Sequence, residues 1–232
     1  VYLDSDSSTV TLLASNQTGY KNLTNIVSMG FVDGQVLGRP IIQREWIFER
    51  SEGVIVLFTE KSDVGQAMLS ANPQKADTLL QEWQAHFADR LYFAIKRTQR
   101  PHEDRFIEQA IRLSNSFDVP IIAHNDVRFL TADDFEAHEA RVCIANSQVL
   151  ADPNRPKAYS AEQYLKTQAQ MTALFADIPA VIDGKEESHK NGKTLAEWLT
   201  NHSEQQKEAR ELYGWYSELK KAGFTDAQAF EL

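Results

Sequence analysis

The chain has 232 residues and a mass of 26.3 kDa, with 42% hydrophobic and 25% charged residues, the proportions of an ordinary globular protein. The net charge of −9 and the pI of about 5.2 exclude an extended basic surface for nucleic acid. The single cysteine, Cys143, excludes an internal disulfide, and no apolar run is as long as a membrane span. These features predict a cytoplasmic protein with no membrane contact.

In chain order, apolar runs and helical spacing alternate along the first half of the sequence. The predicted strands are residues 8–14, 53–58, 90–95 and 119–123. The predicted helices are residues 20–30, 45–50, 63–69, 73–87 and 103–117. This alternation is typical of an α/β protein, and it predicts at least four parallel strands with helices packed outside them.

A polar cluster follows the predicted strand 119–123, and we expect any functional site to lie there. The cluster contains His124, Asn125, Asp126 and Arg128. Thr131 then offers an N-cap for the next helix. A buried strand that ends in polar residues and turns into a helix is how α/β proteins build their sites.

The second half of the sequence has a different character. A turn-rich loop at 152–157 precedes a predicted helix that begins at Ser160 and ends before Pro179. Residues 181–193 are polar with two glycines, and they predict a linker. Residues 194–232 predict a helical tail that folds as a separate module. Its apolar stripe comprises Leu195, Trp198, Leu199, Leu212, Trp215, Tyr216 and Leu219.

Two adjoining stretches of the sequence resemble a known family. They read Ile-Ile-Ala-His-Asn-Asp-Val-Arg-Phe-Leu (121–130) and Asp-Asp-Phe-Glu-Ala-His-Glu-Ala-Arg-Val-Cys-Ile (133–144). Both are similar to the polymerase-and-histidinol-phosphatase (PHP) domain of bacterial replicative DNA polymerase III alpha subunits. Other stretches fit the same family in consistent order, namely 13–23, 62–66, 97–101, 152–160 and 174–179.

The resemblance implies a fold and a domain organisation. Residues 1–180 would form a PHP-like α/β domain, the later strands of a seven-stranded βα barrel. The family's N-terminal strands, which carry metal ligands, have no counterpart before Val1. The tail after residue 181 matches nothing in the family and is expected to form a small helical hairpin of unknown origin.

The resemblance also bears on metal binding. Metal-binding members of the superfamily carry a histidine at the position of Arg128, and a guanidinium has no lone pair for a metal ion. We therefore expect Arg128 to pair with Asp126 in a degenerate site around His124, with no metal, no cofactor and no catalytic residue. The weak candidate ligands that remain are Asp126, His124 and Glu60.

A basic loop follows the predicted strand 90–95. Lys96, Arg97 and Arg100 could contact phosphate or a nucleic-acid backbone. The alternative, a solvated loop or one paired with acidic groups of the same chain, is the more ordinary arrangement and is favoured here.

Three functions remain open. The first is a metal-free scaffold that holds the proofreading exonuclease subunit, epsilon, and meets other polymerase III subunits and DNA. Its parent would be a DNA-directed DNA polymerase, a nucleotidyltransferase, but this piece would lack the polymerase catalytic residues and have no activity. The second is a metal-dependent phosphoesterase or 3′–5′ exonuclease that uses Asp126, His124 and Glu60. The third is an interaction module with a fused helical tail.

Overall fold

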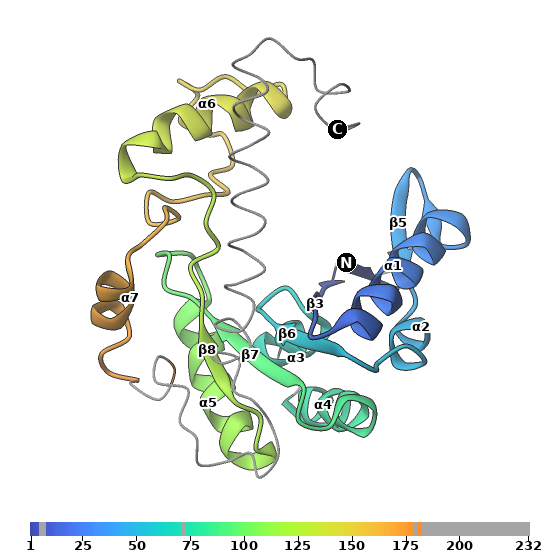
Figure 1. The fold of residues 1–232 in the computed structure, drawn as a ribbon. Coiled ribbons are helices and arrows are strands. Elements are labelled where there is room, and N and C mark those ends of the chain that lie inside the picture. Colours follow the sequence, from blue (N-terminus) through green and yellow to red (C-terminus); the bar gives the residue numbers. More distant parts are fainter. Residues whose placement is uncertain (5–7, 71–72, 179–180, 182–232) are drawn as a thin grey trace, which may run out of the picture. The chain divides into compact units, whose positions relative to one another are not determined.

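The computed structural model describes residues 1–4, 8–70, 73–178 and 181 (Figure 1). The chain divides into two compact units, residues 1–188 and 189–232, and every described residue belongs to the first. The described elements are β1 (Tyr2–Leu3), β2 (Ser8–Thr9), β3 (Thr11–Ala14), α1 (Gln17–Val32), β4 (Gln35–Val36), β5 (Arg39–Ile42), α2 (Arg44–Phe48), β6 (Val54–Phe58), α3 (Asp63–Leu69), α4 (Pro73–Phe87), β7 (Leu91–Ile95), α5 (Glu103–Phe117), β8 (Ile121–Ala123), the 3-10 helix η1 (Ala132–Asp134), α6 (Phe135–Ala145) and α7 (Gln168–Leu174).

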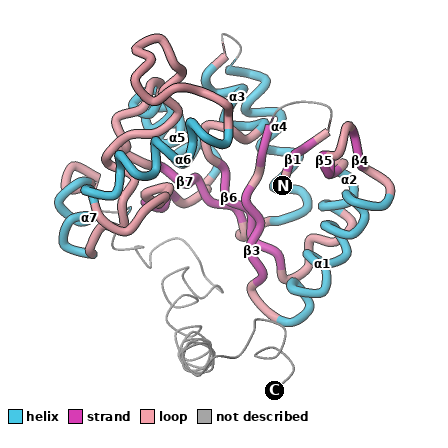
Figure 2. The backbone as a smooth tube through the Cα atoms, turned by 90° about the horizontal axis from the view of Figure 1, so that it is seen from above, coloured by secondary structure: helices cyan, strands magenta, loops and turns pink. Residues whose placement is uncertain are grey.

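The larger of two sheets positions the site. Its strand order is β3-β6-β7-β8, and the last three strands run parallel (Figure 1). Figure 2 shows β3, β6 and β7 of this sheet from above. Every residue of β7 is buried, which explains why this strand reads as a continuous apolar run. α4 and α5 pack against β7. Because β6, β7 and β8 are parallel, their carboxyl ends lie at one edge of the sheet. The α/β class predicted from the sequence is therefore confirmed.

An aromatic cluster forms the centre of the core. Trp83 of α4 is fully buried, and its ring lies 5.0 Å from Phe48, 5.5 Å from Phe58 and 5.5 Å from Phe87, centroid to centroid. Its indole Nε1–H donates to Oδ2 of Asp63 at 3.0 Å. Because these residues come from α2, β6, α3 and α4, the indole ties the helices to the sheet.

The prediction of four parallel strands is wrong, because β3 is antiparallel to β6. The reason is a close approach of two glycines. A Cβ atom added to Gly19 would lie 1.8 Å from the carbonyl oxygen of Gly53, and Gly53 has a φ of +68°. Ser15 also donates its backbone N–H to this carbonyl at 2.8 Å. These contacts fix the end of β3 beside the start of β6, which makes the pair antiparallel.

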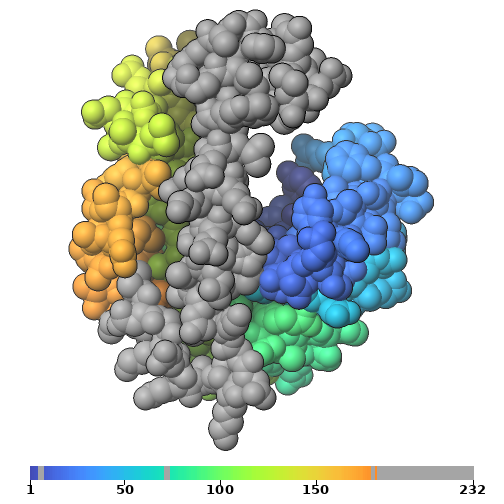
Figure 3. Space-filling view, in the orientation of Figure 1, coloured from blue at the N-terminus to red at the C-terminus, as the bar shows by residue number. Residues whose placement is uncertain are grey.

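The predicted strand 8–14 divides at Val10 between two sheets. β2 joins a small second sheet of order β2-β1-β5-β4, whereas β3 joins the larger one. The short strands β1, β4 and β5 were not predicted. The β4–β5 hairpin turns at Leu37 and Gly38, which have φ values of 50° and 80°. Leu37 is fully exposed at the tip, and α1 and this hairpin form the blue surface in Figure 3.

The predicted helix at Ser160 is also wrong, because tertiary contacts hold this segment extended. The backbone N–H of Leu165 donates to the carbonyl of Phe129 at 3.1 Å, and Tyr164 forms a parallel bridge with Phe129. The side chain of Gln163 accepts from the backbone N–H of Ser160 at 3.0 Å. The helix begins only at α7.

The predicted linker 181–193 and helical tail 194–232 lie outside the described residues, except for Val181. That residue is 7% exposed and belongs to the hydrophobic core. None of the helices in the described part of the chain is both long and apolar enough to cross a membrane.

Candidate functional site

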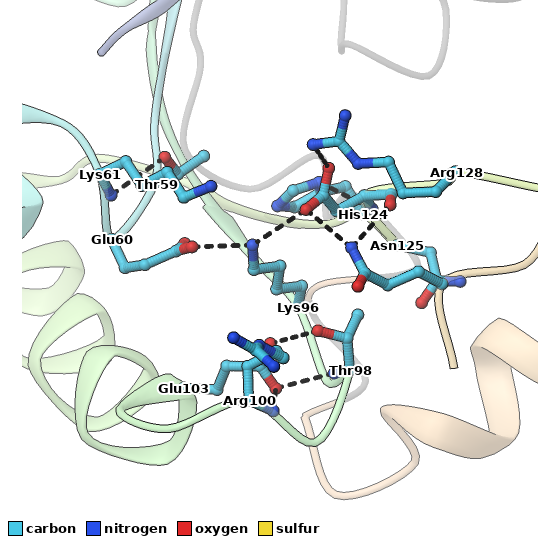
Figure 4. A network of polar contacts seen from close by, with 12 residues as sticks. Thr59, Glu60, Lys61, Lys96, Thr98, Arg100, Glu103, His124, Asn125 and Arg128 are labelled. Carbon is cyan, nitrogen blue, oxygen red and sulfur yellow. Dashed lines mark hydrogen bonds and ion pairs between the residues drawn. The ribbon is translucent and has the colours of Figure 1, made fainter. Parts of the chain in front are cut away.

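The carboxyl ends of β6, β7 and β8 bring together side chains that are far apart in the sequence. Glu60 follows β6, Lys96 follows β7, and Asp126 follows β8. The ammonium of Lys96 lies between the two carboxylates, 2.7 Å from Oε1 of Glu60 and 3.4 Å from Oδ2 of Asp126 (Figure 4). The Lys96 side chain is only 8% exposed. Lys96, which the sequence offered as a phosphate contact, is thus the buried cation at the centre of this site.

Asp126 has an unusual backbone conformation and several hydrogen-bond donors. Its φ of 42° lies in the left-handed region that non-glycine residues rarely adopt. Its Oδ2 atom accepts from Nε2 of Gln163 at 3.0 Å as well as from Lys96. Gln163 also donates to the backbone carbonyl of Asp126 at 3.2 Å. A strained backbone conformation of this kind persists only where surrounding contacts hold the residue in place. Here the hydrogen bonds to Asp126 do that.

The predicted pairing of Arg128 with Asp126 is confirmed. Nη2 of Arg128 donates to Oδ1 of Asp126 at 2.7 Å, and the guanidinium lies over the ring of Tyr159, 5.5 Å from its centroid. Both oxygens of the Asp126 carboxylate therefore face a cation.

We expect Arg128→Ala to lower the free energy of unfolding by less than about 1 kcal/mol. The Arg128 side chain is 39% exposed, and Asp126 keeps Lys96 and Gln163 as donors when the guanidinium is removed. Urea unfolding followed by circular dichroism measures this. A loss of 3 kcal/mol or more, of the size found for a broken buried pair, would contradict it.

His124 lies beside the same cluster. Its backbone N–H donates to the carbonyl of Ile95 at 2.9 Å, which extends the pairing of β8 with β7 by one residue. Burial lowers the pKa of His124, and the nearby Lys96 ammonium lowers it further, against the opposing effects of Asp126 and Glu60. The imidazole is thus biased toward its neutral form.

These side chains do not fit a metal ion in the arrangement that the structure shows. The carboxylates of Glu60 and Asp126 face Lys96 and Arg128, whose positive charges repel a metal cation. Across residues 1–4, 8–70, 73–178 and 181, no group of three or more His, Cys, Asp or Glu side chains could hold a metal ion.

The segment 157–166 crosses the edge of the sheet beside the site. The Asn125 side chain donates Nδ2–H to the carbonyls of Glu162 at 2.9 Å and Tyr164 at 2.7 Å. Together with the two bonds from Gln163 to Asp126, these contacts fix the segment to the end of β8. Asn125 belongs to the polar cluster predicted from the sequence. Gln163 was not predicted as a site residue, because Asp126, to which it donates, lies 37 residues away in the sequence.

The remaining residues of the basic loop contact groups of the same chain. Arg97 forms two bonds of 2.6 Å with Asp177 and lies over the ring of Phe175. This pairing holds the pKa of Asp177 below its usual range. Arg100 donates from Nη1 to the carbonyl of Lys157 at 2.7 Å. A phosphate contact by Lys96, Arg97 or Arg100 therefore stays a prediction.

A buried carboxylate shapes this loop. Glu103, the first residue of α5, is 6% exposed. It accepts from the backbone N–H of Thr98 at 2.7 Å, from the Thr98 hydroxyl at 2.5 Å and from the backbone N–H of Arg100 at 3.2 Å. These bonds hold the turn that follows Lys96, so Glu103 fixes the conformation of the basic loop.

A histidine of α6 lies in a buried contact next to the site. The ring of His138 packs edge-on against Tyr159 at 4.6 Å and lies 5.4 Å from Phe129, and it is 7% exposed. Its Nδ1 atom lies 3.1 Å from Nη2 of Arg141. Since a guanidinium only donates, this contact suits a neutral imidazole.

The stability of the chain should therefore depend on the protonation of His138. Burial and the neighbouring Arg141 lower its pKa, while Glu139 opposes them. A histidine whose pKa is lower in the folded state stabilises the fold fully above its unfolded-state pKa of about 6.5. That stabilisation is lost as the pH falls below this value toward the folded-state pKa. We expect the urea midpoint to drop between about pH 7.5 and about pH 5.5, and to drop less in His138→Gln. Equal drops in both proteins would contradict this.

Comparison with known proteins matches residues 1–98 to the PHP domain family. The chain is 45% identical over 188 residues to the DNA polymerase III subunit alpha of Pseudomonas fluorescens, which covers 81% of this chain and 16% of the relative. It is 42% identical over 188 residues to the DNA polymerase III subunit alpha of Pseudomonas aeruginosa, with the same coverage. It is 40% identical over 174 residues to that of Escherichia coli K12, and this match covers 75% of this chain and 15% of the relative. The chain thus matches about one sixth of the length of these relatives.

Proposed function

Because the chain belongs to the PHP domain family through residues 1–98, and is similar to polymerase alpha subunits over most of its length, we propose that it is part of a bacterial replicative DNA polymerase. Within that polymerase it acts as a scaffold and binds the proofreading exonuclease subunit, epsilon. Its sheet represents the later strands of a PHP-type βα barrel. The proposal includes a cytoplasmic location and contact with DNA and other polymerase III subunits through the parent protein.

The observation that carries the scaffold proposal is the pairing of Lys96. A phosphoesterase of this family would need free carboxylates to hold its metal ion. Here the ammonium of Lys96 lies between Glu60 and Asp126, and Arg128 faces the other oxygen of Asp126. These contacts support a domain whose polar edge stabilises its own fold.

Metal analysis of the purified chain tests this proposal against the phosphoesterase alternative. After dialysis without a chelator, we expect well under one equivalent of zinc, manganese or iron per chain, and no hydrolysis of a phosphodiester. A stoichiometric metal that Glu60→Gln removes would contradict the scaffold proposal, since Glu60 pairs with Lys96 in the site described above.

The docking function needs a separate experiment. The epsilon subunit of Pseudomonas fluorescens is the appropriate partner, because the alpha subunit of this organism is 45% identical to the chain. We expect the two purified proteins to co-elute in gel filtration. Separate elution at micromolar concentrations would contradict the docking function.

A further inference from the structure

Helix α1 has an exposed apolar face beside the face that packs on the sheets. The packed face contacts β3, β5 and β6. On the adjoining face, Tyr20, Val27 and Phe31 are 62%, 42% and 54% exposed. With Thr24 among them, these residues follow helical spacing and form one stripe about 16 Å long. Contiguous exposed apolar side chains of this kind mark a surface that binds another molecule.

The β4–β5 hairpin continues this apolar surface past the C-terminal end of α1 (Figure 3). Val32, Val36 and Leu37 are 79%, 57% and 100% exposed. Leu37 also has a φ of 50° in a two-residue turn, a position that favours asparagine or glycine. Leucine is therefore unfavourable there both for its backbone and for its exposure, unless another surface covers it. We call the six apolar side chains of the helix and the hairpin the α1 patch.

The chain around the α1 patch is almost free of charge. Within residues 17–38 only Lys21 and Asp33 are charged, in a chain where 25% of the residues are. Nucleic acids and anionic membranes are bound by clusters of Lys and Arg, which this surface lacks. Thr24 and Ser28 donate their hydroxyls to carbonyls of the same helix, so the face presents few unpaired polar groups. The partner that it fits is a protein surface of the same apolar character.

The stripe on α1 has the same spacing in both directions. Its four residues are separated by four, three and four positions. Two antiparallel copies of the helix therefore place Tyr20 of each against Phe31 of the other, and Thr24 against Val27. An aromatic pair then lies at each end of the contact. A two-fold interface needs this property, because the same patch must fit itself.

The two charges beside the patch have the same symmetry. Lys21 follows Tyr20, whereas Asp33 lies two residues past Phe31, and both charged residues are exposed. Antiparallel packing brings Lys21 of each copy to the end of the contact that carries Asp33 of the other. Opposite charges thus meet at both ends, although each chain has a net charge of −9.

We propose that the α1 patch is an interface between two copies of this chain, whose α1 helices pack antiparallel about a two-fold axis. Each copy contributes on the order of several hundred Å², toward the lower end of a standard interface, which buries about 800 Å² per partner. We therefore expect a dimer with a micromolar dissociation constant.

Sedimentation equilibrium of the full chain, from submicromolar to tens of micromolar concentrations, measures the dimer. Phe31→Asp places a carboxylate in the apolar contact and should weaken dimerisation at least about tenfold. The matched control is Ile144→Asp, because Ile144 of α6 is 80% exposed and lies outside the patch. This control should dimerise like the wild-type chain. Circular dichroism of dilute protein checks that both variants keep the wild-type melting temperature, and Val27→Asp replaces Phe31→Asp if the latter does not.

A charge exchange tests the antiparallel orientation. Lys21→Glu places a carboxylate near Asp33 of the other copy and should weaken the dimer about threefold. Adding Asp33→Lys restores opposite charges and should restore the dimer. Within one copy, residues 21 and 33 are about 18 Å apart along the helix, beyond the screening length of roughly 8 Å at physiological salt. The rescue therefore reports a contact between copies.

Each outcome decides the proposal. A dimer that Phe31→Asp weakens, that Ile144→Asp leaves intact and that the charge exchange restores supports it. A wild-type chain that stays monomeric at tens of micromolar overturns it. So does a dimer that withstands Phe31→Asp, one that Ile144→Asp weakens equally, or one that the charge exchange does not restore. Metal content and co-elution with epsilon are measured independently, so failure of the dimer leaves the scaffold proposal intact.

Discussion

Replacing Trp83 with alanine should lower the free energy of unfolding by about 3–5 kcal/mol, the range found for truncating a large buried aromatic side chain. Trp83 is fully buried and packs against Phe48, Phe58 and Phe87, so its loss opens a cavity where four elements meet. Chemical denaturation followed by far-ultraviolet circular dichroism measures the change without depending on tryptophan fluorescence.

Trp83→Phe is the matched control. Phenylalanine keeps most of the apolar volume and removes the hydrogen bond from the indole to Asp63. Asp63 retains Arg44, whose Nη2 atom lies 3.3 Å from the same carboxylate. We therefore expect Trp83→Phe to cost much less than Trp83→Ala. Similar costs would mean that the hydrogen bond, and not the packing, carries the stability.

Arg155→Ala should cost about 3–5 kcal/mol, because it leaves a buried charge without its partner. Nη2 of Arg155 lies 2.5 Å from Oε2 of Glu139, and the two side chains are 9% and 4% exposed. Within the described part of the chain, neither carboxylate oxygen of Glu139 has another hydrogen-bond partner. The guanidinium is thus the compensating charge for this carboxylate.

A double-mutant cycle checks this explanation. Its single variants are Arg155→Met and Glu139→Leu. The double variant removes both charges and fills the space with apolar atoms, so it should be more stable than Arg155→Met alone. A double variant as unstable as the single Arg155 variant would argue against an electrostatic origin.

The elements predicted most accurately are those whose signals are local. α3, α4 and α5 have the bounds predicted from apolar spacing. Ser62 caps α3 by accepting from the backbone N–H of Gly65, a contact between residues three apart. The direction of β3 depends on Gly19 meeting Gly53, which no local pattern reveals. The extended segment at Ser160 likewise results from bonds to the chain after β8 that override its helical spacing.

The same distinction applies to the site. The pair of Asp126 and Arg128 could be predicted because the two residues are neighbours on one loop. The central role of Lys96 could not, because its contact with Asp126 joins residues 30 positions apart on different strands. Without the strand order, a lysine in a basic loop is most simply explained as a surface group.

The chain between α6 and α7 is held to the sheet mainly by polar contacts of Asn125 and Gln163. Between residues 146 and 167, only Gln163 is buried. Regions with few buried apolar side chains open at a lower free energy than the core does. Under native conditions a protease should therefore cut here before it cuts the strands of the larger sheet, and backbone amides here should exchange with deuterium ahead of those in β6 and β7. Such an opening would detach Gln163 from Asp126 while the parallel strands stay folded.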